Sequence, residues 1–170
     1  MAAVAPRGDM IETEITLKPI GIIRSELVSR EEAPNQGSEG SPDAWLEVHS
    51  AYAEGLEGIR VGDNVILVTW FHKAHRNILK LHPRRDRNRP LTGVFSTRSP
   101  DRPNPLGLHR VTVREISGNR LRVGPIEAID GTPVVDIKPY PDWEQGCLQV
   151  VTEFRVPGWL TKLMKQPREA

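Results

Sequence analysis

A proline-rich stretch between residues 93 and 110 contains the groups best suited to binding and chemistry. Pro100, Pro103 and Pro105 fix their own φ angles and donate no backbone hydrogen bond, so residues 99–105 cannot continue a strand. Each proline also favours an extended conformation in the residue before it. The result is a stiff loop that holds its polar side chains still, which suits a binding site. A proline-rich surface turn without function is the competing interpretation.

Three polar residues in or after this stretch are candidates for specific roles. Arg98, at the start of the loop, could grip a carboxylate with its planar guanidinium, or it could form a structural ion pair that pins the loop. Asn104 and Asp136 are the candidate catalytic residues. Asp136 lies in an apolar segment, where a carboxylate needs a partner. It could accept a proton from a substrate nitrogen, but an ion pair with Lys138 or an arginine is the favoured interpretation.

Positive charge is concentrated in one part of the chain. Residues 72–114 contain eleven Lys and Arg against two Asp, a local charge of +9, whereas the whole chain has a formal charge of +1. This asymmetry favours a polyanionic partner on one face; a solvated basic loop is the alternative. The candidate nucleic-acid-binding residues lie between Pro83 and Pro90: Arg84, Arg85, Arg87 and Arg89. Their segment has almost no apolar residues, so these charges should reach solvent.

Several classes of protein and site are disfavoured by the sequence. His72, His75 and His82 match no strong metal-binding pattern and have no acid or cysteine close by, so no metal is expected. The single cysteine, Cys147, cannot form an internal disulfide and does not indicate an oxidising compartment. No glycine-rich fingerprint follows a strand, which argues against a Rossmann cofactor site. No segment resembles a signal peptide or a membrane span, so we expect a cytoplasmic protein without a membrane partner.

The elements that must position these residues are short strands, because 15 prolines and 14 glycines favour many turns. The pattern predicts strands over 15–24, 45–49, 63–72, 92–95, 107–116, 120–126 and 134–137. Residues 63–72 have no polar face, which is typical of a strand buried on both sides, either under a second layer or in a subunit interface. In 107–116, alternation places His109 with the valines on the inner face and the arginines outside.

These elements predict a mainly β, barrel-like domain over residues 15–170 with short helices and no linker. A loop rich in proline and glycine is expected over 29–43, a helical turn or a loop over 51–59, and hairpin or turn signals occur at 117–119 and 130–131. Residues 1–14 have no periodic pattern and are expected to be a disordered tail. Residues 158–166 have apolar residues at helical spacing, which predicts a short C-terminal helix.

The stretch from residue 93 to residue 108, G-V-F-S-T-R-S-P-x-R-P-N-P-L-G-L, resembles the signature of the TsaA/TrmO-like family. Further matching motifs follow the same order at residues 20–25, 70–72 and 130–140, so that the resemblance covers about residues 18–142. The best-known members are S-adenosylmethionine-dependent methyltransferases that act on N6 of threonylcarbamoyladenosine beside the tRNA anticodon. The resemblance implies a small, usually dimeric β-barrel, unlike the Rossmann-type methyltransferases.

The resemblance also implies a set of residues that line the S-adenosylmethionine pocket. They are Arg24, Ser25, Phe71, His72, Lys73, Arg98, Leu108, His109, Asp130, Gly131, Thr132 and Pro133. The turn at 130–132 would offer backbone groups to the cofactor, and Arg98 would bind its carboxylate. The cofactor supplies the reactivity, so the protein mainly positions methyl donor and acceptor.

Two positions depart from the pattern of the tRNA enzymes. Lys73 stands where glutamine often follows the Phe-His pair, and His109 stands where serine or threonine is usual. The extra C-terminal domain of a longer tRNA enzyme is also not expected here. The leading hypothesis is still a methyltransferase acting on modified tRNA adenosine, because the resemblance to the family is extensive. The alternatives are a methyltransferase of the same fold with a small-molecule acceptor and a non-catalytic RNA-binding β-barrel.

Overall fold

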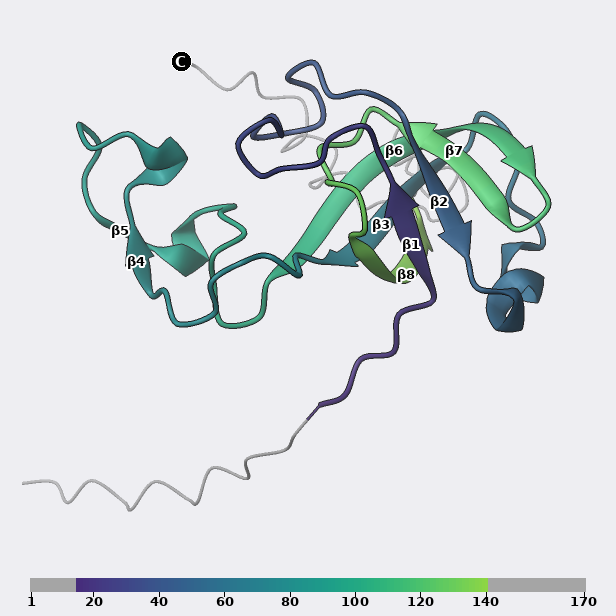
Figure 1. The fold of residues 1–170 in the computed structure, drawn as a ribbon, viewed down its shortest axis with the longest axis horizontal. Helices are drawn as coiled ribbons and strands as arrows, with labels where there is room; N and C mark the ends of the chain where they lie inside the picture. Colours follow the sequence, from purple (N-terminus) through teal and green to yellow (C-terminus); the bar gives the residue numbers. More distant parts are fainter. Residues whose placement is uncertain (1–14, 141–170) are drawn as a thin grey trace, which may run out of the picture.

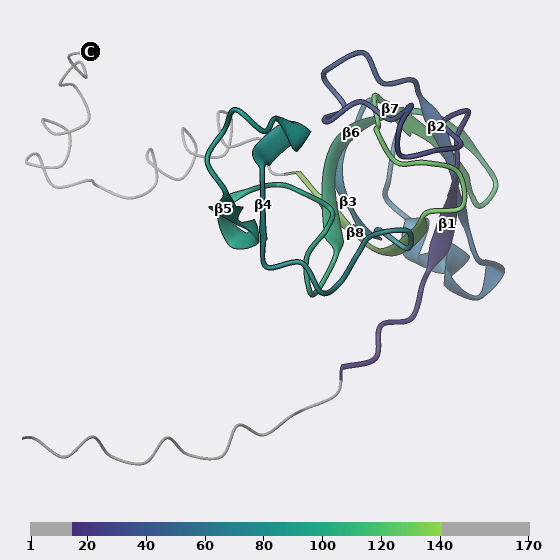
Figure 2. The same ribbon diagram turned by 60° about the vertical axis from the view of Figure 1, so that its left-hand side comes forward.

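The computed structural model describes residues 15–140, which form a closed barrel of six strands (Figure 1). The predictions for residues 1–14, Cys147 and the helix at 158–166 lie outside the described residues. The barrel strands are β1 (Gly21–Arg24), β2 (Ala44–Val48), β3 (Asn64–Trp70), β6 (Leu106–Ser117), β7 (Arg120–Gly124) and β8 (Pro133–Pro139). They follow one another around the ring in the order β1-β2-β7-β6-β3-β8, as the view in Figure 2 shows.

The remaining elements lie in two connections. A 3-10 helix, η1 (Ser50–Leu56), links β2 to β3. The connection from β3 to β6, residues 71–105, projects from the barrel and is called the arm (Figure 1). The arm contains a two-stranded sheet and two short 3-10 turns: β4 (Lys80–Leu81), β5 (Thr92–Gly93), η2 (Pro83–Arg85) and η3 (Val94–Ser96).

Strand direction gathers three connections at one end of the barrel. Every neighbouring pair of strands is antiparallel, so chain direction alternates around the ring. The C-terminal ends of β1, β3 and β7 therefore meet the N-terminal ends of β2, β6 and β8. The loops 25–43 and 125–132 and the base of the arm all leave from this end, which is called the mouth.

The barrel interior is filled by alternate residues of its strands. Ile23, Leu46, Leu67, Val111 and Leu121 come from five different strands and are almost completely buried. Burial of each such aliphatic side chain contributes about 1.5–3 kcal/mol to stability. Two polar side chains are buried among the strands at the mouth end, one from β3 and one from β6: Thr69 and His109.

The mainly β, barrel-like fold and the alternation of β6 are confirmed. Within β6, His109, Val111 and Val113 are buried, whereas Arg110 and Arg114 are exposed. The hairpin between β6 and β7 turns at residues 118–119, and residues 130–131 form a turn as expected. The helical turn predicted over 51–59 is present as η1. That residues 15–170 form one domain stays a prediction beyond residue 140.

Four predicted strands are too long: those over 63–72 and 120–126 end at Trp70 and Gly124, and the other two lose half of their length or more. The strand expected over 15–24 is limited to β1, and Ile15 and Leu17 before it are exposed, because pairing with β2 and β8 begins only at Gly21. The strand expected over 92–95 is limited to the two residues of β5, since the chain turns into η3 at Val94.

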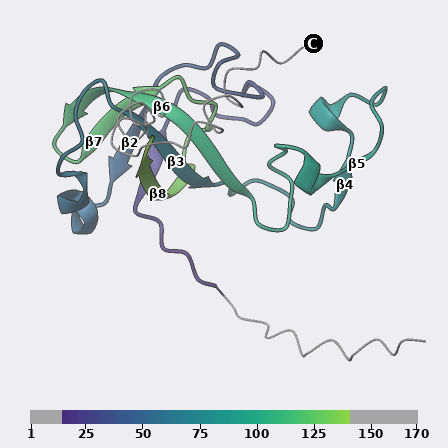
Figure 3. The same ribbon diagram turned by 180° about the vertical axis from the view of Figure 1, so that it is seen from behind.

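Strand β3 is buried on only one face within a single chain. Val65, Leu67 and Thr69 are buried inside the barrel, while Ile66 and Val68 on the outer face are half-buried. The prediction of burial on both faces is therefore wrong for one chain, and the alternative of a subunit interface stays a prediction. Figure 3 shows this outer face, where β3 lies between β6 and β8. No helix within residues 15–140 is long and apolar enough to cross a membrane.

Candidate functional site

The proline-rich loop is pinned by Arg102. Its guanidinium donates to the carbonyl oxygens of Ser99 at 2.8 Å, Thr97 at 2.6 Å and Val94 at 3.2 Å. These carbonyls belong to residues just before the loop and at its start. The pinning role that the sequence left open for Arg98 therefore belongs to its neighbour four residues later.

Arg98 is an exposed cation at the mouth. Its guanidinium Nη2 lies 3.3 Å from the carbonyl oxygen of Leu108, and no ion pair involves it among residues 15–140. A planar guanidinium in this state has several donors to offer to a carboxylate. The anchoring role of Arg98 stays a prediction.

An ion pair between Arg30 and Asp101 joins the arm to loop 25–43 and is called the loop clamp. Arg30 Nη2 donates to Asp101 Oδ2 at 2.8 Å and to Oδ1 at 2.9 Å, and both side chains are mostly buried. Asp101 Oδ1 also accepts the backbone N–H of His75 at 2.8 Å, and Arg30 Nη1 donates to the carbonyl of Lys73 at 3.1 Å. The loop clamp thus holds three segments together at the mouth.

The surroundings of Asp101 stabilise its charged form. Burial raises the pKa of this carboxyl, but the hydrogen bond from Arg30, the N–H of His75 and the charges of both residues outweigh burial and lower the pKa below its ordinary value of 3.8. The loop clamp is therefore a charged pair over the whole physiological pH range.

His109 forms the polar floor of the mouth. Its Nε2 lies 2.8 Å from the hydroxyl of Thr69, and its Nδ1 lies 3.0 Å from Glu127 Oε1. The second contact is not a well-directed hydrogen bond, since no described group meets hydrogen-bond geometry at Nδ1. The ring of Phe71 packs edge-on against the imidazole, with centroids 5.6 Å apart. His109 therefore faces the protein on every side that the structure describes.

Glu127 stands beside this histidine with its side chain 20% exposed. Burial raises the pKa of the Glu127 carboxyl, but the contact with His109, the backbone N–H of the residue itself and the charge of Arg98 together lower the pKa below its ordinary value. The mouth thus keeps an ionised carboxylate close to the exposed Arg98.

The turn at 130–132 uses its backbone N–H groups within the protein, so that the predicted contact of its backbone with the cofactor could involve only its acceptors. The N–H groups of Asp130, Gly131 and Thr132 donate to carbonyl oxygens within the protein, those of residues 27, 23 and 129. The Thr132 hydroxyl donates to the same carbonyl of residue 129 at 2.7 Å, and Pro133 pairs with β1. Ser25 donates its N–H to Asp130 Oδ1 at 3.1 Å. The turn therefore ties β1 to loop 125–132, and only its remaining acceptors could face a ligand.

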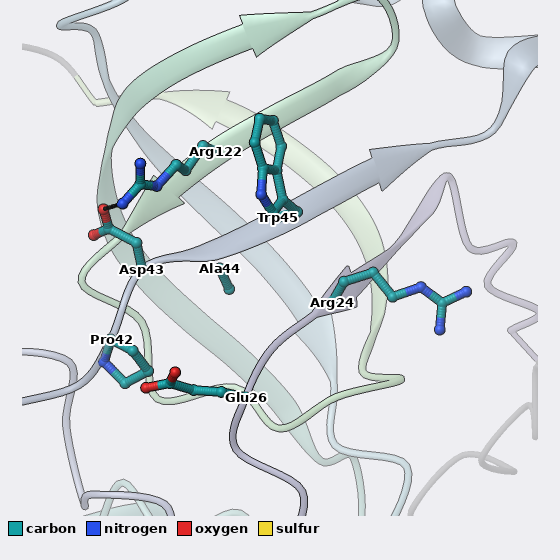
Figure 4. A pocket seen from close by; sticks show the side chains of 7 residues that line it. All are labelled: Arg24, Glu26, Pro42, Asp43, Ala44, Trp45 and Arg122. Atoms are coloured by element: carbon teal, nitrogen blue, oxygen red, sulfur yellow. Dashed lines mark ion pairs between the residues drawn. The ribbon is translucent and has the colours of Figure 1, made fainter.

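Arg24 lies apart from the other predicted cofactor residues. It points outward from β1 and pairs with Glu47 at 2.9 Å. A surface hollow of about 350 Å³ adjoins it, lined also by Asp43, Trp45 and Arg122 (Figure 4). A second hollow, of about 410 Å³, continues along the outside of the same strands. Asp43 and Arg122, which Figure 4 shows as an ion pair, lie 3.2 Å apart, and Arg24 is paired with Glu47, so three of the charged residues that line the hollow already have partners. The mouth, which joins nearly all the other predicted residues, is the better candidate site.

His72, Lys73 and Leu108 complete the predicted cofactor set at the mouth. His72 and Leu108 are exposed. Burial lowers the pKa of the His72 imidazole, and the positive charge of Lys73 lowers it further. Lys73 reaches back to the carbonyl of Val28, 3.4 Å away. Within residues 15–140, no group of three or more potential metal ligands occurs.

The four arginines of the candidate nucleic-acid set lie together on the arm and are all exposed: Arg84, Arg85, Arg87 and Arg89. Two of the four form ion pairs. Arg84 pairs with Glu39 at 2.6 Å and Arg89 with Asp86 at 3.4 Å. The expectation that these charges reach solvent is confirmed, although two of the four arginines are also paired with an acidic side chain.

The two candidate catalytic residues are not side by side. Asn104 is exposed at the mouth, between two prolines at the start of β6. Asp136 lies opposite Val68 on the outside of the barrel, and its carboxylate pairs with Lys138 at 2.8 Å. The structural pairing favoured for Asp136 is therefore present. A catalytic role for either residue stays a prediction.

Sequence reasoning missed Arg30, Arg102 and Glu127 as residues of the mouth. Each acts through a partner in another part of the chain or through carbonyl groups, which leave no mark on side-chain spacing. For Glu127 there was one local signal, an acidic residue between Ile126 and Ala128, both almost completely buried. An acid in such a position requires a partner, and this would have marked it for attention.

The groups at the mouth fit the chemistry of S-adenosylmethionine. The cofactor ends in a carboxylate, for which Arg98 offers an exposed guanidinium. It also has apolar and ring surfaces, for which Phe71 and the exposed Leu108 are suited. Nδ1 of His109 is a buried polar atom without a directed partner at the same place. The mouth thus offers partners for the carboxylate and for the apolar and ring surfaces of this cofactor.

The family model described as the tRNA-methyltransferase O N-terminal domain matches residues 22–143. This chain belongs to that family. A protein of Methanothermobacter thermautotrophicus, named a probable S-adenosyl-L-methionine-binding protein, is 40% identical over 131 residues, covering 77% of this chain and 93% of that relative. An S-adenosyl-L-methionine-binding protein of Archaeoglobus fulgidus is 40% identical over 124 residues, covering 73% and 88% of the two chains.

Solved structures agree with this assignment. The crystal structure of TrmO from Pseudomonas aeruginosa superposes with a TM-score of 0.63 at 30% identity, covering 78% of this chain. The alignment spans only 58% of the length of that TrmO chain. The family and the non-Rossmann β-barrel fold are thus confirmed, and the cofactor that the resemblance implies is the ligand after which the relatives are named.

Gly107 should be intolerant of a side chain. A Cβ at this position would meet the Thr69 hydroxyl, lie 2.6 Å from the Phe71 ring and lie 2.7 Å from His109 Nε2. We expect Gly107→Ala to lower the free energy of unfolding by about 1–3 kcal/mol, the usual cost of overpacking. Urea denaturation measures this change. Gly55→Ala is the matched control, because nothing lies within 4 Å of its Cβ; equal effects of the two substitutions would contradict the packing described for the mouth.

The loop clamp should make stability depend on acid. A carboxyl with a lowered pKa in the folded state stabilises the protein above its unfolded pKa, and this stabilisation disappears as the pH falls through the folded value. We expect Asp101→Asn to lower the thermal midpoint at pH 7. The difference from the parent should shrink below about pH 4, near the ordinary value of 3.8. Thermal unfolding between pH 7 and pH 2 tests this, and a difference that stays constant with pH would exclude an ionic loop clamp.

Proposed function

We propose that this chain is an S-adenosylmethionine-dependent methyltransferase that acts on N6 of threonylcarbamoyl-modified adenosine next to the tRNA anticodon. One observation carries the proposal: the β3–β6 connection joins the candidate cofactor residues at the mouth to the exposed arginines of the arm. A methyl donor held at the mouth would thus lie on the same side of the barrel as a surface for a polyanion. The family and the names of the relatives support both the reaction class and the cofactor.

The residues of the mouth would mainly bind and orient. When bound, S-adenosylmethionine supplies an activated methyl group on sulfur, and transfer needs donor and acceptor in line. Arg98 would hold the cofactor carboxylate, and Phe71 and Leu108 would cover apolar surface. Asn104, exposed at the start of β6, would contact the acceptor. Asp136 is a weaker candidate for the reaction, because it is paired on the outer face of the barrel.

The arm would bind the anticodon stem-loop. A stem-loop presents phosphates around unstacked bases, and this suits a basic segment beside a pocket for one base. Arg85 and Arg87 have no ion-pair partner among residues 15–140, so their charges are fully available for phosphates. Action on tRNA would make the cytoplasm the site of the reaction.

A homodimer would cover the remaining apolar surface. Ile66 and Val68 on the outside of β3 are half-buried, and Leu106 and Leu108 on β6 are 40% and 57% exposed. Apolar residues on adjacent strands of one face favour a protein contact. Because Leu108 also belongs to the predicted cofactor set, the cofactor would lie close to the subunit boundary.

A small-molecule acceptor is the second candidate function. Its support was the departure of Lys73 and His109 from the pattern of the tRNA enzymes. In the structure both residues have internal roles, since Lys73 reaches the carbonyl of Val28 and His109 is enclosed between Thr69 and Glu127. Neither departure then requires a different acceptor, and the tRNA substrate remains the first choice.

Replacement of Arg98 tests the cofactor site. If its guanidinium binds the carboxylate of S-adenosylmethionine, Arg98→Ala should weaken binding by about 1.5–3 kcal/mol, the value of a charge-assisted hydrogen bond. Titration calorimetry with S-adenosylmethionine measures the loss, and thermal unfolding checks that the variant folds. Arg114→Ala, also an exposed arginine of the barrel, serves as control. A folded Arg98→Ala variant with unchanged affinity would remove Arg98 from the site.

Removal of the arm arginines tests the tRNA substrate. Replacing Arg84, Arg85, Arg87 and Arg89 with alanine should weaken tRNA binding and reduce its salt dependence, by about 0.7–0.9 in the log–log slope for each phosphate that is no longer neutralised. Affinity for S-adenosylmethionine should stay nearly unchanged. Arg85 and Arg87 should account for more of the loss than the two ion-paired arginines.

The control variant Arg60→Ala/Arg114→Ala removes exposed charges from outside the arm. Its tRNA binding should match that of the parent. If the parent itself shows no salt-dependent tRNA binding, or transfers no methyl group to unfractionated tRNA, the small-molecule acceptor becomes the better candidate.

A further inference from the structure

Glu127 is a carboxylate that the barrel holds at the mouth in one orientation. One oxygen, Oε1, lies 3.0 Å from His109 Nδ1, and the side chain is only 20% exposed. The other oxygen, Oε2, lies 3.2 Å from the position that a Cβ atom on Gly37 would occupy. Loop 25–43 therefore approaches this oxygen closely at a residue that has no side chain. Removal of a carboxylate from water is costly unless a partner compensates for it.

Four other acids near the mouth already have partners. Asp101 is bound by Arg30, Asp43 by Arg122 and Glu39 by Arg84, and Asp130 accepts the N–H of Ser25. Besides its own backbone N–H, Glu127 has only the imidazole of His109, which is not aligned for a hydrogen bond. Of these five acids, Glu127 and Asp130 lack an ion pair with an arginine, and Glu127 is the one that feels the charge of the exposed Arg98.

The exposed cation whose charge acts on Glu127 is Arg98. The guanidinium of Arg98 rests 3.3 Å from the carbonyl of Leu108, whose neighbour His109 contacts Glu127. Arg98 and Glu127 form no ion pair with each other. The cation of Arg98 is therefore available to bind an anionic group, and the nearby carboxylate of Glu127 is available to bind a cationic group. The ligand group that matches this pair is a zwitterionic α-amino acid, with its carboxylate on the guanidinium and its ammonium on the carboxylate.

We propose that Glu127 binds the α-ammonium group of the methionine moiety of S-adenosylmethionine, and that His109 is the positioning residue that holds the Glu127 carboxylate in place. This inference rests on the proposed function, because it assigns a new residue to the same cofactor site. It also gives a reason for a histidine at position 109. The imidazole fills the floor of the mouth between Thr69 and Glu127 and fixes the carboxylate from below.

The experiment compares ligands that differ only in the group in question. Calorimetry uses S-adenosylhomocysteine, its deaminated 2-oxo acid analogue, which keeps the carboxylate, and methylthioadenosine, which lacks the amino-acid moiety. The proteins are the full chain and its variants Glu127→Gln, Arg98→Ala and His109→Gln. The matched control is Glu31→Gln, which changes an exposed glutamate of loop 25–43.

Glu127→Gln should weaken binding of S-adenosylhomocysteine about ten- to a hundredfold, as expected for loss of a charge-assisted hydrogen bond. The same variant should bind the 2-oxo acid and methylthioadenosine as the parent does. Arg98→Ala should weaken binding of both ligands that keep the carboxylate. His109→Gln should show a smaller loss, confined to the ligand with the amino group. Glu31→Gln should bind all three ligands like the parent.

Two results would overturn the assignment. An equal loss for all three ligands in Glu127→Gln would give Glu127 a purely structural role, and unchanged binding of S-adenosylhomocysteine would leave it only as the partner of His109. If Glu127→Gln does not fold, Glu127→Asp, which keeps the charge but withdraws it by one methylene, must show the same selective loss. If the parent binds none of the three ligands, the proposed function itself is wrong, and this outcome differs from a selective failure of Glu127.

Discussion

Antiparallel closure of a six-stranded ring is the constraint on which the rest of this structure depends. A closed barrel has no unpaired strand edge, and with an even number of strands every neighbour can be antiparallel. Chain direction then alternates around the ring, so every second connection is forced to the same end. Loops 25–43 and 125–132 and the arm meet at the mouth for this reason alone. Residues about a hundred positions apart, such as Ser25 and Asp130, become hydrogen-bond partners, although no sequence motif predicts their contact.

Arginines hold the connections at the mouth together, because the prolines of the loop reduce the number of backbone hydrogen-bond donors. Each proline of the loop removes one backbone N–H but keeps its carbonyl, so the loop has more acceptors than donors. Arg102 supplies three donors to carbonyls at 94, 97 and 99, and Arg76 supplies one to the carbonyl of Pro103. Arg30 reaches from loop 25–43 to the arm, where it donates to the carbonyl of Lys73 and to the carboxylate of Asp101. The stiffness inferred from prolines is therefore the joint product of fixed φ angles and guanidinium forks.

The sequence contained the information for single strands but little of the information for contacts between distant segments. Alternation in β6 placed His109 inside the barrel correctly, and turn residues located the hairpin at 118–119. The predicted strand over 15–24 was too long, since apolar residues such as Ile15 and Leu17 extend the pattern without a partner strand. In the site, Arg24 was assigned by motif position alone, although it follows a buried residue of β1 and so faces outward. Glu127 and Arg30 escaped notice because their partners lie 18 and 71 positions away.

The positive charges of the basic segment do not all have the same role in the structure. A net charge of +9 over residues 72–114 treats every arginine as equivalent. In the structure Arg102 is occupied by carbonyls, Arg84 and Arg89 by acids, and Arg110 lies over the ring of Tyr140 at 4.0 Å. Arg85, Arg87 and Arg98 form no ion pair within residues 15–140. The positive charge free to meet a ligand is therefore smaller than the composition implies, and much of it lies in two places, on the arm and at the mouth. A partner that spans both places must carry anionic groups separated in the same way, and this favours an extended polyanion together with a small anionic cofactor group over either of them alone.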